Sequence, residues 1–161
     1  NYFSNKGFAH LRCVNKLLPR MYVEGFLQKE FNYFIDLQNR ELIGGGLRFN
    51  PFNNFFIGSG FMHEKEVYKD QSEEQNFVKS TNYINYLIDY QQNILLENIV
   101  YYQFKVESLD NYRMLWDGKL TIRGSSWLSM YLNWHLRYDT SILFPDGNSY
   151  FEINNGLGFQ F

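Results

Sequence analysis

Strict alternation of apolar and polar side chains constrains this chain most, and it is clearest between Ser126 and Asp139. Every even position from Leu128 to Tyr138 is apolar or aromatic, and the odd positions carry hydroxyl, amide, imidazole or charged groups. Successive side chains of a β-strand point to opposite faces, so this segment predicts a strand with one apolar and one polar face. The same period recurs at Asn82–Gln91 and Phe151–Phe161, and helical periodicity is hard to find. The pattern predicts an all-β fold.

Nine segments show this alternation. They span residues 7–17, 20–33, 41–50, 54–66, 80–92, 94–106, 112–122, 126–139 and 149–161. Several exceed the ~5–6 residues of a typical globular strand, and they suffice for the ~9–11 residues that cross a bilayer. Short connections are predicted at 18–20, 50–53, 92–93 and 123–125, and longer loops at 34–40, 65–79, 107–111 and 140–148. Short turns at one end and long loops at the other are typical of antiparallel up-and-down transmembrane β-barrels.

The composition narrows the classes of protein that fit this pattern. The 161 residues include 16 Phe, 13 Tyr and 3 Trp, and aromatic residues near the predicted strand ends suit the interfacial girdles of a barrel. A soluble barrel or sandwich is the alternative, but strand length and aromatic placement disfavour it. The balance of 15 Lys+Arg against 17 Asp+Glu argues against a nucleic-acid partner, and the single cysteine, Cys13, excludes an intramolecular disulfide. We expect one domain over residues 1–161.

The carboxyl-terminal segment resembles the signal that the barrel-assembly machinery of the outer membrane reads. Leu157, Phe159 and Phe161 alternate with small or polar residues up to the last position. Such a segment can add as an edge strand to an open sheet while presenting an apolar row to lipid. We therefore expect outer-membrane lipids and this machinery among the partners.

Larger parts of the chain resemble a family of uncharacterised bacterial outer-membrane barrels, a domain of unknown function also described as a salt-induced outer membrane protein. The matching segments include Gly7–Arg12, Glu24–Gln28, Arg40–Phe49, Gly58–Glu64, Tyr101–Gln103, Asp110–Arg113 and Gly156–Phe161. The resemblance is closest to Bacteroidota-type members. It implies a multi-pass β-barrel in the bacterial outer membrane and implies no reaction, ligand or cofactor.

Bacterial single-chain barrels have even strand numbers, so nine strands imply that upstream strands are missing. Family members are longer at the amino-terminal end. We expect about ten or twelve strands in the complete protein, twelve being favoured by family length.

If the apolar rows face lipid, the alternate rows line the barrel interior. The charged residues predicted to form an interior network are His10, Arg12, Glu24, Glu30, Arg48, Asp89, Glu97, Arg113, Asp117, His135, Arg137, Asp139 and Glu152. Their acids and bases are nearly balanced, and buried charges require such partners. We predict that Arg137 pairs with Glu152 or Asp139. Gly44, Gly46, Gly58 and Gly60 share the inward parity, where they relieve crowding or let the sheet curve.

The residues give little support to catalysis. Outer-membrane lipid hydrolases pair Ser and His on a lipid-facing row, and none of the three histidines belongs to a His-x-Ser pair. An Asp139–His135 pair and metal binding near His63 are weaker interpretations than salt bridging. We predict no catalytic residue, metal or cofactor. The expected role is structural or accessory, as a subunit of a larger envelope complex. The alternative is a narrow passive channel for small polar solutes, and an outer-membrane lipid hydrolase ranks third.

Overall fold

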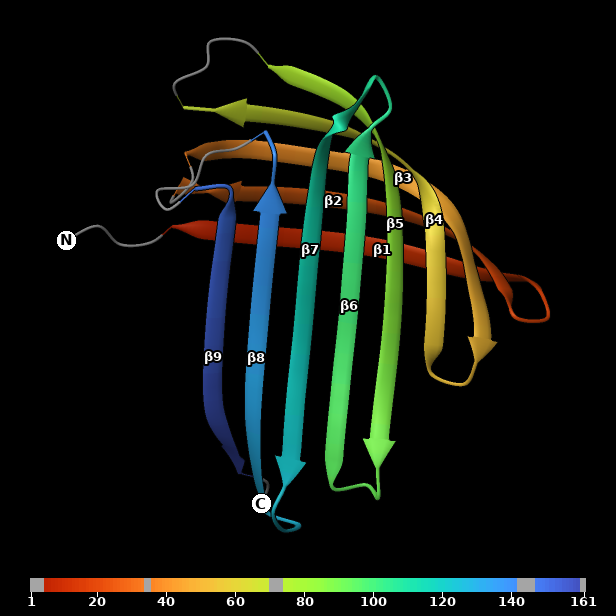
Figure 1. Ribbon diagram of the computed structural model, residues 1–161, viewed down its shortest axis with the longest axis vertical. Helices are drawn as coiled ribbons and strands as arrows, with labels where there is room; N and C mark the ends of the chain where they lie inside the picture. Colours follow the sequence, from red (N-terminus) through yellow and green to blue (C-terminus); the bar gives the residue numbers. More distant parts are fainter. Residues whose placement is uncertain (1–4, 34–35, 70–73, 142–146, 160–161) are drawn as a thin grey trace.

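The computed structural model describes residues 5–33, 36–69, 74–141 and 147–159, and it shows one antiparallel sheet of nine strands in chain order (Figure 1). The strands are β1 (Lys6–Leu18), β2 (Met21–Asn32), β3 (Leu37–Phe52), β4 (Phe55–Tyr68), β5 (Gln75–Tyr90), β6 (Ile94–Lys105), β7 (Ser108–Arg123), β8 (Leu128–Asp139) and β9 (Ser149–Phe159). The nine up-and-down strands confirm the all-β prediction. In these described ranges, no helix has the length and apolar character needed to cross a membrane.

Three of the predicted long loops were too long. β3 begins at Leu37 rather than near residue 41, β4 and β5 extend into the predicted 65–79 loop, and β7 begins at Ser108. Charged residues at these strand ends suggested loops, yet several of them are buried on one face of the sheet. Only the connections at 69–74 and 140–148 remain long, so the contrast between the two ends of the sheet is weaker than predicted.

The sheet curls strongly, and glycines permit the curl. β1–β3 run at a steep angle to β6–β9, and β3–β5 bend between these two groups (Figure 1). Gly46 lies directly opposite Gly60, and Gly58 lies opposite Tyr83. A Cβ atom at Gly46 would collide with the Ser59 carbonyl oxygen, and one at Gly58 with the Tyr83 ring. The crease between the two strand groups therefore depends on these side chains being absent.

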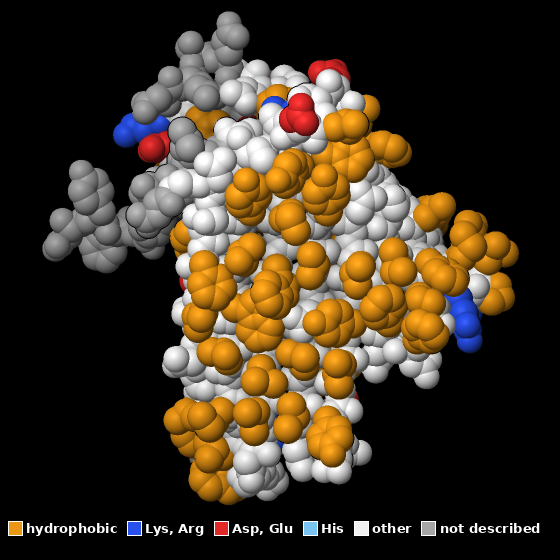
Figure 2. Space-filling model, viewed as in Figure 1, with side chains coloured by type: hydrophobic (Ala, Val, Ile, Leu, Met, Phe, Trp, Pro, Cys, Tyr) orange, Lys and Arg blue, Asp and Glu red, His pale blue; other side chains and the backbone are white. Residues whose placement is uncertain are grey.

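The curl gives the sheet a convex and a concave face with opposite chemistry. The convex face is apolar and exposed, as Leu11 and Phe61 show with 62% of their surface accessible. Over β5–β9 this apolar surface is nearly continuous (Figure 2). The concave face carries most of the buried polar side chains. Residues that we expected to face lipid, including Leu132, Leu136 and Ile153, share one face by register.

The sheet is open, since β1 and β9 form its two edges and are not paired with each other. The edges approach at one end, where Lys6 Nζ on β1 lies 4.0 Å from Glu152 Oε2 on β9. A closed barrel, as predicted from the sequence, is therefore not what the described residues form by themselves.

Candidate functional site

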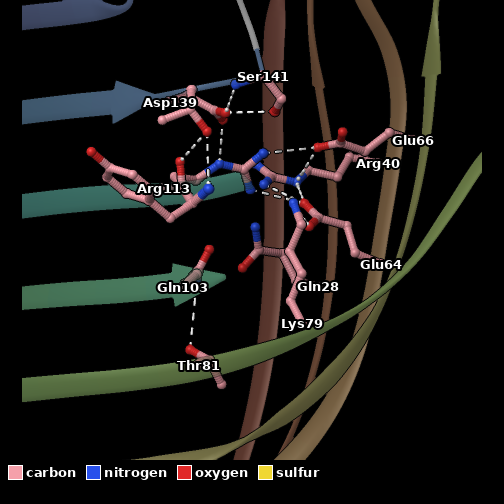
Figure 3. Close-up of polar contacts among 12 residues, drawn as sticks. Gln28, Arg40, Glu64, Glu66, Lys79, Thr81, Gln103, Arg113, Asp139 and Ser141 are labelled. Atoms are coloured by element: carbon pink, nitrogen blue, oxygen red, sulfur yellow. Dashed lines mark hydrogen bonds and ion pairs between the residues drawn. The ribbon is translucent and has the colours of Figure 1, made fainter. Parts of the chain in front are cut away.

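A cluster of ion pairs occupies the concave face near the end of the sheet where the 69–74 and 140–148 connections lie. It draws on six strands: β2, β3, β4, β5, β7 and β8. Its members, hereafter the charge cluster, are Glu30, Arg40, Glu64, Glu66, Lys79, Arg113, Arg137 and Asp139. Figure 3 labels all of them except Glu30 and Arg137. Register explains why they share a face, because Arg40 lies opposite Glu66 on β4 and Arg113 lies opposite Asp139 on β8.

Arg113 on β7 connects the two sides of the curled sheet. Its guanidinium donates to Asp139 Oδ2 at 2.6 Å, to Glu64 Oε1 at 3.0 Å and to Glu66 Oε1 at 3.2 Å. Glu64 in turn pairs with Arg40 and with Lys79. The side chains of Glu64, Arg113 and Asp139 are at most 2% exposed. Full burial in multiple ion pairs makes this cluster the most demanding polar arrangement in the described chain.

The cluster holds equal numbers of opposite charges. Arg40, Lys79, Arg113 and Arg137 face Glu30, Glu64, Glu66 and Asp139. Ser141, just beyond β8, donates from its hydroxyl to Asp139 Oδ1 at 2.7 Å and from its backbone amide to the same oxygen at 3.1 Å. Charges desolvated in this way are tolerated only where partners surround them.

A second set of polar interactions lies on the concave face outside the charge cluster. Arg12 on β1 pairs with Glu24 on β2 and donates to the Tyr83 hydroxyl on β5 at 2.6 Å. The Tyr83 hydroxyl donates to Glu24 Oε2 at 2.9 Å. This triad links β1 and β2 to the bent strand β5 across the concave face.

A cavity of about 470 Å³ lies between the charge cluster and this triad. Its walls combine apolar and aromatic side chains with hydrogen-bonding groups, among them Phe26, Leu42, Met62, Tyr101, Gln103 and Leu115. A wider hollow of about 520 Å³ continues toward the opposite end of the sheet, and Asp117 and His135 line both spaces. The concave face is thus filled by ion pairs at one end and hollow toward the other.

All the predicted network residues lie on the concave face by register, but the structure pairs only some of them. Arg12 meets Glu24, and Arg113 and Arg137 meet Asp139. The Arg137–Asp139 pairing, 3.2 Å between Nη2 and Oδ2, is one of the two we predicted. The other predicted network residues with charged or polar partners are Glu30 with Arg40, Asp117 with His135, His10 with Gln28, and Glu152 with Lys6, Tyr150 and Asn154.

Other predicted residues are not joined to the network. Arg48 packs its guanidinium 3.7 Å from the centre of the Phe56 ring. Asp89 and Glu97 lie toward the hollow end and form no ion pair within the described ranges. The suggested Asp139–His135 pair does not form, because His135 bonds to Asp117 and Asp139 bonds to Arg113.

Arg40 and Lys79 lie at the edges of the predicted loops 34–40 and 65–79, and Glu64 and Glu66 lie at the end of the predicted strand 54–66, where it overlaps a loop. None of these four cluster members is in the predicted network. The signal was present, since Arg40 continues the even parity of Gly44 and Gly46, and Glu66 continues that of Gly58 and Gly60. Of the carboxyl-terminal signal residues, Leu157 and Phe159 lie on the convex face, and Phe161 lies outside the described residues. Cys13 is an exposed free thiol on the convex face.

The described residues contain no group of three or more His, Cys, Asp or Glu side chains that could hold a metal ion. No curated protein and no solved structure matches the chain significantly. The family described as a protein of unknown function, DUF481, matches residues 3–161, almost the whole sequence. The chain therefore belongs to the DUF481 family.

Proposed function

We propose that this protein is an outer-membrane β-barrel with a non-catalytic, structural or accessory role, whose interior is sealed at one end by the charge cluster. The observation that carries the proposal is the reversal of the usual faces: the outside of the curled sheet is apolar, and its inside holds the ion pairs. Soluble monomers rarely expose a continuous apolar surface larger than a few hundred Å². A lipid-facing barrel exterior explains it.

The height of the apolar surface suits a bilayer. On β8 it runs from Leu128 to Tyr138, about 33 Å along the strand at ~3.3 Å per residue. A tilt of ~40° reduces this to roughly 25 Å, the height of the apolar band of outer-membrane barrels. On the convex face of β2–β4, the band ends at a row of charges formed by Lys29, Glu41 and Lys65.

These charges pair outside the proposed membrane band. Lys29 Nζ lies 2.8 Å from Glu41 Oε1, and Lys65 Nζ lies 2.7 Å from Glu74 Oε2 in the connection before β5. The hydrogen bond from Lys65 lowers the pKa of the Glu74 carboxyl. Charges in water at the rim and apolar side chains below it are the arrangement that a bilayer selects.

A barrel also requires each edge strand to be paired. The Lys6–Glu152 contact of 4.0 Å brings the β1 and β9 edges near each other at one end. An edge left open in a bilayer would expose unsatisfied backbone groups, which lipid cannot hydrogen-bond. β1 and β9 run in the same direction, so a barrel with only antiparallel pairs needs an odd number of further strands between them, in keeping with the ten or twelve expected from the sequence. We propose that closure by such strands accompanies membrane insertion.

The test is refolding from urea into lipid vesicles, with tryptophan quenching by brominated lipids and protection from protease as readouts. Leu132→Arg, at mid-strand on the convex face, should reduce the free energy of unfolding in vesicles by about 2–4 kcal/mol. Asn133→Arg places the same charge on the concave face of the same strand, and it should cost much less. Two results would refute the proposal. One is a protein that is monodisperse in detergent-free buffer and whose tryptophans are not quenched by brominated lipids. The other is an equal loss in the free energy of unfolding for the two variants.

A narrow passive channel is the second candidate, and the hollow of about 520 Å³ at the end away from the charge cluster favours it. Planar-bilayer recordings separate the two roles. A sealed barrel is silent, and the double variant Glu64→Ala and Arg113→Ala should then produce openings. Discrete openings of the unaltered protein would favour the channel.

A further inference from the structure

The cavity of about 470 Å³ falls in the ~300–1,000 Å³ range of small-molecule sites. Phe8, His10 and Phe26 of β1 and β2 line one side of it, and Tyr83 and Tyr101 of β5 and β6 line another. The rings of His10 and Phe26 stack at 6.3 Å, and those of Tyr83 and Tyr101 lie 5.5 Å apart. Two aromatic walls therefore face a common space.

The charges that line this cavity already have partners. Arg12 pairs with Glu24, Arg40 with Glu30, and His135 with Asp117. Arg137, the remaining charged lining residue, pairs with Asp139. A charged ligand would find no uncompensated charge of opposite sign here, and it would have to be desolvated without a partner. The lining therefore selects a neutral ligand.

Two polar residues that line the cavity, Gln103 and Arg12, have buried atoms without a hydrogen-bond partner among the described residues. Gln103 is 7% exposed, and its amide donates to Thr81 Oγ1 at 3.4 Å (Figure 3). Its carbonyl oxygen, Oε1, is buried without a hydrogen-bond partner among the described residues, and so is Nε of Arg12. Such groups are costly unless a ligand or water satisfies them. One is an acceptor and the other a donor, and a hydroxyl group can serve both.

We propose that this cavity binds a neutral polyhydroxylated ring, of the chemical class of a mono- or disaccharide. Gln103 Oε1 and Arg12 Nε have almost no accessible surface in the empty cavity, so a rotation of each side chain accompanies binding and lets the hydroxyls satisfy both atoms. The C–H face of the ring packs against the aromatic walls. The inference goes beyond a structural role, and it holds whether or not the hollow below the cavity conducts solutes.

The test is isothermal titration calorimetry with maltose and methyl glucoside, against glucuronate and glucosamine as charged counterparts. The protein is held in amine-oxide micelles, because maltoside detergents would compete. Maltose should bind at least about tenfold more tightly than either charged sugar. Gln103→Leu should weaken maltose binding about tenfold, the loss expected for one buried hydrogen bond. Gln38→Leu, the same change at an exposed site on β3, should leave the affinity unaltered.

A second variant covers the case in which Gln103→Leu does not fold. Leu115→Trp fills the cavity with a larger side chain and should abolish maltose binding while circular dichroism still reports the sheet. Folded protein that binds neither neutral sugar, equal affinity for the charged sugars, or unchanged affinity in the folded cavity variants would overturn the inference. Vesicle insertion measured on the same samples separates this failure from that of the proposed barrel: inserted protein that ignores maltose refutes the sugar site alone.

Discussion

The two ends of the concave face differ in how their polar and charged side chains are satisfied. Near the 69–74 and 140–148 connections, polar side chains are buried in the charge cluster, and Glu64 is inaccessible to solvent. Toward the opposite end, Glu97, Lys119 and Asn154 line a hollow of about 520 Å³. In the charge cluster, the charged side chains pair with one another. At the hollow end, solvent hydrates them. The same alternating strands therefore form a region filled by ion pairs and a hollow region within one sheet.

Disrupting the charge cluster should cause the largest loss of stability. Glu64→Leu leaves Arg40, Lys79 and Arg113 short of their shared carboxylate. Uncompensated buried charges typically cost about 3–5 kcal/mol. We expect a loss of this size in the free energy of unfolding, measured by urea titration of the protein in vesicles or micelles.

The matched control is Glu97→Leu, which removes a carboxylate from the same face at the hollow end. Because water solvates the neighbouring charges there, we expect less than about 1 kcal/mol. Similar losses for the two variants would show that the cluster is not distinct from the hollow end.

Disrupting the triad of Arg12, Glu24 and Tyr83 should cause an intermediate loss of stability. Tyr83→Phe removes the hydroxyl that accepts from Arg12 at 2.6 Å and donates to Glu24 at 2.9 Å. The ring remains, so packing against Gly58 is kept, and we expect a loss of about 1–2 kcal/mol. Urea titration measures it, and Tyr90→Phe, on the exposed end of β5, is the control. A loss no larger than that of the control would remove the triad as a structural tie.

The exposed ion pair between Lys65 and Glu74 should contribute least to the stability of the protein. The Glu74 side chain is exposed and accepts a hydrogen bond from Lys65, which lowers the pKa of its carboxyl. The folded state thus binds this proton less tightly than the unfolded chain, so the contribution is present at neutral pH and lost as pH falls through the lowered pKa. Glu74→Gln should shift the thermal midpoint slightly at neutral pH and not at all at a pH below the lowered pKa. A difference that persists in acid would contradict the assignment.

The sequence predicted the strands and their faces because a period of two is a local property. The alternation from Leu128 to Asp139 defines both faces of β8 without knowledge of its neighbours. The partners of Arg113 could not be predicted in the same way, since Glu64 and Glu66 lie on β4 and reach Arg113 only across the curl. For the same reason Arg40 and Lys79 were taken for loop residues: charges near a strand end look solvated until the opposing side of the sheet is known.

The polar interactions of the charge cluster and the triad join residues that are far apart in the sequence, and this affects the order in which contacts form during folding. Neighbouring strands meet through short connections, whereas Arg113 and Glu64 are 49 residues apart and Arg12 and Tyr83 are 71 apart. Loop closure makes distant contacts form after local ones, so hairpins precede the polar interactions that span the curl. Interactions absent from the transition state alter unfolding rates and leave folding rates nearly unchanged. The ion pairs therefore determine how long the native protein persists once formed, and the hairpins determine how quickly it forms.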